Sequence, residues 1–277
     1  MRFSKVSLYA FALATVSATP AIAQDAADPP APITVSGSVA LVSDYRLRGI
    51  SQTDKNAAVQ GGITISHESG LYLGAWGSNL SGWGTFGGAN VELDAILGYK
   101  TAVGDGGTLD VGVTWYTYPG GFSNSDVFEG FAKLAGTTGP LSLTAGAYYA
   151  PKQQSIGNYS ATPFSRGQRQ DNLYLTGDAA AALPTTPVTL KAHIGYSNGN
   201  PGLGPNGTSL APTGEYFDWA LGADVSLFGK LTFNVSYIDT DIGRREAAYL
   251  QPNFSKGQDG TGDIADPTIV FSVSTAF

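Results

Sequence analysis

The sequence consists largely of short segments in which apolar and polar residues alternate. Between residues 188 and 197, for example, Leu190 and Ile194 alternate with Lys191 and His193. Strand side chains point in turn to the two faces of a sheet, so each such segment predicts a β-strand with one apolar and one polar face. Twelve strands are predicted, at residues 33–46, 57–67, 71–79, 90–101, 108–118, 126–136, 141–150, 172–183, 188–197, 215–228, 231–240 and 267–277.

The connections between these strands alternate in length. Short turns are predicted at residues 68–70, 103–107, 137–140, 184–187 and 229–230. Longer polar loops alternate with them, at residues 47–56, 80–89, 119–125, 151–171, 198–214 and 241–266. A soluble β-sandwich has no reason to follow this rule, whereas an outer-membrane barrel has short periplasmic turns and long extracellular loops. The pattern predicts an all-β, up-and-down antiparallel transmembrane barrel of about 12 strands, with both termini in the periplasm.

Charged residues lie on the polar face of several predicted strands. An unpaired charge in a dry core costs several kcal/mol, so this face should meet water or other polar groups inside the barrel, and lipid should cover the apolar face. Arg48 is expected near the mouth of the barrel. The predicted pore-lining residues are Asp44, Arg46, Arg48, Glu92, Asp94, Asp110, Glu129, Lys133, Asp178, Lys191, His193, Asp218 and Asp224.

Aromatic residues near the loop ends of the apolar faces predict a girdle at the lipid headgroups. The residues expected in it are Tyr45, Tyr99, Tyr149, Tyr196, Phe217 and Tyr237. The last segment, TIVFSVSTAF, ends at Phe277 and places Ile269, Phe271 and Val273 on the lipid side. Its terminal Phe resembles the C-terminal signal that delivers outer-membrane barrels to the barrel assembly machinery, so Phe277 is predicted to be an assembly signal.

The N-terminal segment reads as a signal peptide. Arg2 and Lys5 precede an apolar stretch that is too short to span a membrane, and an A-x-A cleavage pattern ends at Ala23. The predicted organisation is a signal peptide at residues 1–23, a Pro-rich leader at 24–32 and the barrel at 33–277. Loss of Arg2 and Lys5 changes the net charge from −7 to −9. The acidic chain has no basic stripe for nucleic acid, and without cysteine it has no disulfide framework.

Residues 42–80, VSDYRLRGISQTDKNAAVQGGITISHESGLYLGAWGSNL, resemble the start of a known bacterial family. The SDYRLRGIS element is the most specific part, and the similarity extends more weakly to the terminal Phe. The family is the TorF-type porin family, a group of proteobacterial proteins long described as conserved and of unknown function. The resemblance implies an outer-membrane barrel and a porin of a Gram-negative bacterium, and it implies no catalytic residue.

Enzymatic and metal chemistry find little support among the residues. The two histidines, His67 and His193, are not placed to serve a serine nucleophile at the outer rim. The acidic pair of Glu92 and Asp94 is better read as lining charge than as glycosidase carboxylates. The segment at 257–263 lacks the spacing and bidentate Glu of a calcium-binding EF-hand. No catalytic residue, metal or cofactor is predicted.

The sequence is compatible with three functions. In the first, the barrel is a porin for small hydrophilic solutes or ions, and the excess of carboxylates on its inner face gives a weak cation preference. In the second, opposite charges pair across a closed lumen, and the barrel acts structurally or adhesively through its extracellular loops. A barrel enzyme is the third. The predicted partners are outer-membrane lipid, the assembly machinery and small solutes, and the pattern fits a monomer as well as an oligomer.

Overall fold

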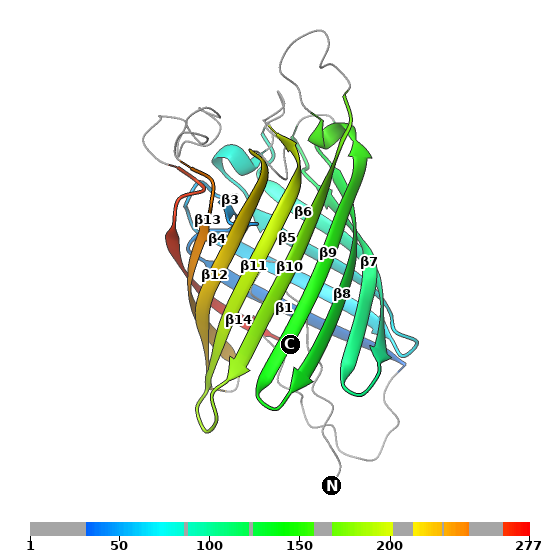
Figure 1. The fold of residues 1–277 in the computed structure, drawn as a ribbon, viewed down its shortest axis with the longest axis vertical. Helices are drawn as coiled ribbons and strands as arrows, with labels where there is room; N and C mark the ends of the chain where they lie inside the picture. The colour runs from blue at the N-terminus through cyan, green and yellow to red at the C-terminus, as the bar shows by residue number, and fades with distance from the viewer. Residues whose placement is uncertain are drawn as a thin grey trace.

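The chain folds into a closed antiparallel β-barrel of twelve long strands (Figure 1), as the alternation predicts. The computed structural model describes residues 32–85, 88–121, 124–157, 168–201, 213–228, 230–243 and 263–277. The predicted signal peptide and all but the last residue of the Pro-rich leader lie outside these residues. Among the described residues no helix is long and apolar enough to cross a membrane.

The barrel strands follow one another around the ring in chain order, and β1 closes the ring against β14. Two short strands, β2 (Arg46–Leu47) and β3 (Ile50–Ser51), form a separate two-stranded sheet between β1 and β4. The barrel strands are β1 (Ile33–Val42), β4 (Ala58–His67), β5 (Leu71–Asn79), β6 (Val91–Val103), β7 (Gly107–Thr117), β8 (Val127–Thr138), β9 (Leu141–Gln153), β10 (Gln170–Ala182), β11 (Val188–Pro201), β12 (Thr213–Leu227), β13 (Leu231–Thr240) and β14 (Thr268–Ala276). Short 3₁₀ helices lie at η1 (Gly82–Thr85) and η2 (Gln154–Ile156).

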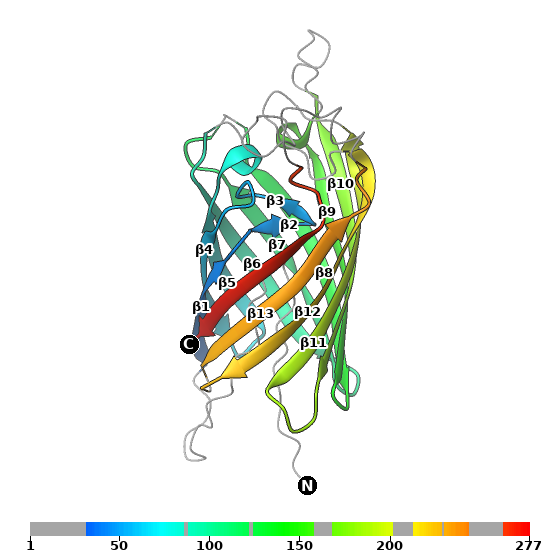
Figure 2. The same ribbon diagram turned by 90° about the vertical axis from the view of Figure 1, so that its left-hand side faces the viewer.

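The two ends of the barrel differ in their connections. The start of β1, the C-terminus and the short turns share one end, here called the terminus end, and the longer connections share the other, the loop end (Figures 1 and 2). At the terminus end, Phe277 and Gly37 exchange two backbone hydrogen bonds of 2.8 and 2.9 Å. The Phe277 ring lies against Gly37, where a Cβ would come within 2.6 Å of it. The last residue of the chain therefore takes part in closing the ring.

The outer face of the barrel is apolar along its strands. Val39 and Leu41 of β1, and Ile269 and Phe271 of β14, are exposed, whereas Val270 between the last two points inward and is buried. This alternation leaves a continuous apolar surface on the outside, which is what lipid requires of a barrel whose backbone hydrogen bonds are all satisfied between strands.

Two predictions about the aromatic girdle are wrong. Tyr45 is only 4% exposed and packs inside the barrel, since the chain turns inward after Val42 instead of continuing as a strand to Arg46. Tyr99 is exposed, but it pairs with Leu71 next to a short turn and thus lies at the terminus end. The residues exposed near the loop end are Tyr149, Phe217 and Tyr237, while Tyr196 is half-buried there.

Candidate constriction in the barrel lumen

A β-hairpin, made of β2 and β3, folds into the lumen near the loop end (Figure 2). Arg46 pairs with Ser51 and Leu47 with Ile50, so Arg48 and Gly49 form a two-residue turn. Both turn residues have positive φ, 51° and 80°, as the type I′ turn of tight hairpins requires. Residues 47–56 were predicted to be a long polar loop outside the barrel, and this placement is wrong. The segment is polar, but the barrel wall buries most of it.

A network around one carboxylate holds the base of the hairpin. Asp44 accepts a hydrogen bond of 2.8 Å from Nε of Arg46 and one of 2.5 Å from the hydroxyl of Ser51. The hydroxyl of Thr53 also donates to Asp44, at 3.3 Å. Nη1 of Arg46 donates to the carbonyl oxygens of Gly49 and Asp266 at 2.8 and 2.9 Å. Arg46 is 2% exposed, so the charge that the sequence places inside is enclosed by its own loop.

Arg48, at the tip of the hairpin, reaches the opposite wall. Its Nη2 donates to Oε1 of Glu129 on β8 at 2.5 Å, and its Nη1 to Oδ1 of Asn172 on β10 at 2.7 Å. Its Cζ lies 4.2 Å above the ring of Tyr174 on β10. The hydroxyl of Tyr216 on β12 donates to the Arg48 carbonyl at 3.0 Å. Because β8 and β10 flank β9, which lies opposite β1 in the ring, the hairpin spans the lumen.

Burial and the charge of its partner act in opposite directions on Arg48. Burial by itself lowers the pKa of the guanidinium. The neighbouring Glu129 carboxylate raises this pKa by more than burial lowers it, so the pKa lies above its usual range. The guanidinium is therefore a permanent charge that is buried at the tip of the hairpin, and it depends on Glu129 to be tolerated there.

A second polar cluster lies on the wall at mid-height. Nδ1 of His193 on β11 is 2.6 Å from Asp178 on β10, and Nε2 is 3.2 Å from Asp218 on β12. The hydroxyl of Tyr174 also donates to Asp218, at 3.0 and 3.1 Å. Both ring nitrogens face carboxylates, so a protonated imidazole ties three strands together. Neither nitrogen is left to act as a base.

Two lysine clusters line the terminus end. Nζ of Lys133 lies 3.2 Å from Asp110, and Nζ of Lys100 lies 3.8 Å from the same carboxylate. On the other side Nζ of Lys191 lies 2.6 Å from Asp224. Each of these pairs joins neighbouring strands, and none reaches across the lumen.

Glu92 and Asp94 on β6 differ from the other lumenal acids. None of the seven ion pairs among the described residues includes either of them. Glu92 is fully buried, and it accepts a hydrogen bond of 3.5 Å from the hydroxyl of Tyr118. Tyr45 lies nearby, edge-on to Trp76 with ring centroids 5.5 Å apart. Both carboxyl groups thus lack an ion-pair partner among the described residues, and Glu92 lies among aromatic side chains.

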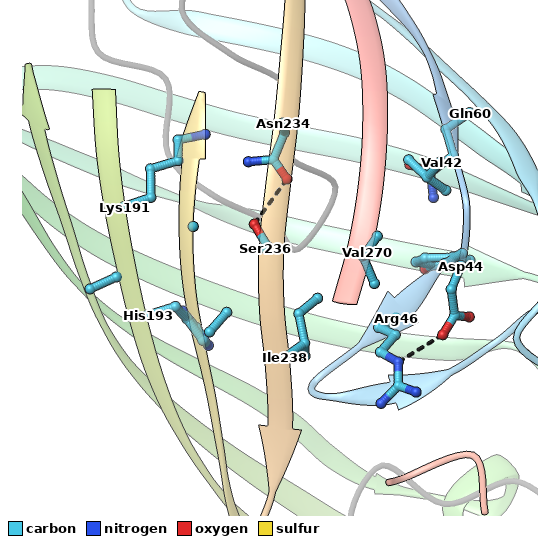
Figure 3. A pocket seen from close by; sticks show the side chains of 14 residues that line it. Val42, Asp44, Arg46, Gln60, Lys191, His193, Asn234, Ser236, Ile238 and Val270 are labelled. Atoms are coloured by element: carbon cyan, nitrogen blue, oxygen red, sulfur yellow. Dashed lines mark hydrogen bonds and ion pairs between the residues drawn. The ribbon is translucent and has the colours of Figure 1, made fainter. Parts of the chain in front are cut away.

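A small cavity of about 50 Å³ separates the hairpin base from the wall of β11 to β14 (Figure 3). Asp44 and Arg46 line it from the hairpin side, and Lys191, His193 and Asn234 line it from the wall. Figure 3 shows the Asp44–Arg46 pair at one edge and the lysine and histidine side chains at the other. Charged groups therefore border this cavity on two sides, while Val42, Ile238 and Val270 give it apolar surface.

The predicted site residues fall into separate groups. The hairpin carries Asp44, Arg46 and Arg48, and the strands carry the rest on their lumenal face: Glu92, Asp94, Asp110, Glu129, Lys133, Asp178, Lys191, His193, Asp218 and Asp224. Whether these residues line a conducting pore stays a prediction.

Several lumenal residues were not in the predicted set. Lys100 shares the inward face with Glu92 and Asp94, and the alternation of β6 alone could have placed it there. Asn172 and Tyr174 stand six and four residues before Asp178 on β10, so the same rule places them inside. No pattern in the neighbouring sequence predicts that Arg48 reaches this wall, because its partners Glu129 and Asn172 lie 81 and 124 residues away in the chain.

Solved porins share this architecture. The NanC porin aligns with a TM-score of 0.54 at 10% identity, over 88% of this chain and 99% of that one. The KdgM porin aligns with a TM-score of 0.53 at 8% identity, over 87% of this chain and 99% of that one. The fold is therefore that of a porin-like β-barrel.

The family of the chain is also clear. The chain belongs to the family described as bacterial protein of unknown function (Gcw_chp), whose model matches residues 26–277. No curated protein matches the sequence. The resemblance to TorF-type porins stays an expectation, since the matched family carries a different description.

Proposed function

We propose that this protein is an integral outer-membrane porin that passes small hydrophilic solutes or ions through a lumen narrowed by the β2–β3 hairpin. The observation that carries the proposal is the contrast between the two barrel faces, which are apolar outside and charged inside. Lipid accepts the outer face, and a lumen lined by ionised groups favours water and polar solutes over a dry core.

The proposal includes an orientation and a route of assembly. The terminus end would face the periplasm and the loop end the outside of the cell, as in bacterial barrels with short periplasmic turns. Phe277 would deliver the chain to the barrel assembly machinery. Removing Phe277 should then impair assembly in the outer membrane while export continues, and a normal amount of heat-modifiable barrel from the shortened chain would contradict this role.

A weak cation preference follows from the lumenal charges. Six of the eight predicted lumenal carboxylates have a basic or imidazole partner, and Glu92 and Asp94 have no ion-pair partner within the described residues. Net negative charge in a narrow passage favours cations. The reversal potential across a KCl gradient measures this preference, and an anion-selective channel would refute it.

Single-channel conductance in a planar bilayer tests the main proposal. Purified, heat-modifiable barrel should give discrete current steps in KCl, whereas denatured protein at the same concentration should give none. Folded barrel that never conducts would favour the second candidate, a closed barrel that acts structurally or adhesively through its loops. The position of the hairpin across the lumen favours this second candidate. Neither candidate requires a catalytic residue.

A further inference from the structure

The wall opposite β1 carries a recognition site for one chemical group. Glu129 supplies a carboxylate and Asn172 an amide oxygen, at 2.5 and 2.7 Å from the two terminal nitrogens of Arg48. Tyr174 supplies an aromatic face 4.2 Å from the guanidinium carbon. The hydroxyl of Tyr116 donates to the second oxygen of Glu129 at 3.1 Å and fixes its orientation.

These groups match a guanidinium better than an ammonium ion. A guanidinium is planar, donates along two edges and stacks on aromatic rings, whereas an ammonium is a compact charge without a face to stack. The site offers the guanidinium two hydrogen-bond acceptors and one aromatic ring. The carboxylate, the amide and the ring all belong to barrel strands, which are held by hydrogen bonds to their neighbours on both sides. The site therefore does not depend on the hairpin for its shape.

The tip of the hairpin holds its own arginine in this site. Beyond the Arg48 side chain, the tip is bound by the hydrogen bond from the hydroxyl of Tyr216 to the Arg48 carbonyl and by the packing of Gly49 against Thr240 and Asp218. A buried ion pair gives little net stability because desolvation offsets most of the attraction. What favours Arg48 over a free cation is its covalent attachment to the hairpin, since even a flexible short linker gives an effective concentration on the order of millimolar.

We propose that this wall is a guanidinium-binding site that Arg48 occupies in cis, and that solutes bearing a guanidinium group bind there by displacing the tip of the hairpin. This inference rests on the proposed porin function for the entry of such solutes. It deepens that function by naming guanidino compounds as a solute class and Arg48 as the internal competitor. Displacement by a solute would also open the lumen that the hairpin spans.

The experiment measures binding of methylguanidinium to purified, detergent-solubilised barrel by isothermal titration calorimetry. The wild type should bind only weakly, because Arg48 competes. Arg48→Ala should bind at least about tenfold more tightly, since the tethered competitor is gone. Adding Glu129→Gln to this variant should remove the gain. Methylammonium should bind the Arg48→Ala variant more weakly than methylguanidinium does.

Two further variants keep the test decisive. Lys100→Ala, which removes a lumenal charge at the terminus end, should bind like the wild type. If Arg48→Ala does not give heat-modifiable barrel, Arg48→Lys replaces it, because the ammonium keeps the charge but fits the site less well. Equal binding by wild type and the folded Arg48 variant, or equal binding with and without Glu129, would overturn the proposal.

Binding and conduction are separate readouts. Calorimetry requires no ion flow, so binding without conductance would refute the porin function and leave the guanidinium site intact. Conductance without tighter binding in the Arg48 variant would do the reverse.

Discussion

The two halves of the lumen neutralise their charges in different ways. At the loop end, Arg48 pairs with Glu129 across 81 residues of chain and is buried together with it. At the terminus end, Lys133 and Lys100 pair with Asp110 on neighbouring strands, and the Lys100 side chain is 32% exposed. One half is bridged by a loop, while the other keeps its charges along the wall.

The difference separates two roles for lumenal charge. A charge paired across the lumen, as at the tip of the hairpin, fixes the position of the element that carries it, since losing one partner leaves the other buried and uncompensated. A charge paired along the wall neutralises its neighbour and leaves the middle of the lumen free. The loop end is therefore where passage should be controlled, and the terminus end is where it should be permissive.

Removing the hairpin should have the largest effect on this comparison. Replacing Arg46 to Ser51 with a short Gly-Ser linker takes away the element that spans the lumen, and single-channel conductance should rise several-fold. The matched control replaces residues 104–106, a turn at the terminus end, with a Gly-Ser linker and should leave conductance near that of the wild type. A hairpin variant with unchanged conductance would show that the loop end is not the narrow half.

The turn of the hairpin offers a subtler way to displace it. At Gly49, φ is 80° and a Cβ would clash with Thr240 Cγ2 and lie 3.0 Å from Asp218 Cβ. Gly49→Ala should therefore destabilise the folded barrel by about 1–2 kcal/mol in denaturant unfolding and raise conductance. Gly61→Ala is the control, because the nearest atom to its Cβ is the Ser38 carbonyl oxygen at 3.5 Å. Similar losses in both variants would mean that the turn is not special.

Charge removal at the loop end should change selectivity more than stability. Glu92→Gln with Asp94→Asn removes the acids that have no ion-pair partner in the described chain, and the reversal potential across a KCl gradient should shift toward anions. Asp218→Asn should shift it less, because Asp218 is paired with His193. Glu68→Gln, at an exposed position, is the control and should leave the reversal potential unchanged. If the double variant also shows no shift, Glu92 and Asp94 do not determine selectivity.

The smallest effect is expected at the terminus end. Lys100→Ala removes the longer of the two contacts to Asp110 and leaves Lys133 at 3.2 Å. A partly exposed ion pair contributes about 0–1 kcal/mol, so both stability and conductance should stay close to wild type. A large change in stability or conductance would show that charge pairs at the terminus end matter as much as those at the loop end.

The sequence was sufficient for the barrel because its periodicity is a local property. The predicted strands at 71–79 and 231–240 agree with β5 and β13 in both bounds. Alternation depends only on which residues stand next to one another, and every strand of a barrel has one lipid face and one lumenal face. The strand count and the placement of charges on the inner face both follow from that rule.

The hairpin could not be predicted in the same way. Half of its six residues are charged or hydroxylated, which is also common in a solvated loop, and Tyr45 continues the alternation as if the strand went on. What distinguishes the two outcomes is pairing with Glu129 and Asn172, far along the chain. A glycine in the turn, Gly49 after Arg48, is a local feature typical of a tight hairpin. It does not indicate whether the hairpin lies inside or outside the barrel.

The distances along the chain between the hairpin and its partners constrain the order of folding. Arg48 is near the N-terminus of the barrel, whereas Asn172 and Tyr216 follow it by 124 and 168 residues. Closing such long loops costs entropy that the contacts repay only afterwards, and a guanidinium buried before its carboxylate arrives would be unpaired. The hairpin should therefore stay hydrated until β8, β10 and β12 have joined the barrel. Its entry into the lumen should be among the last steps of folding.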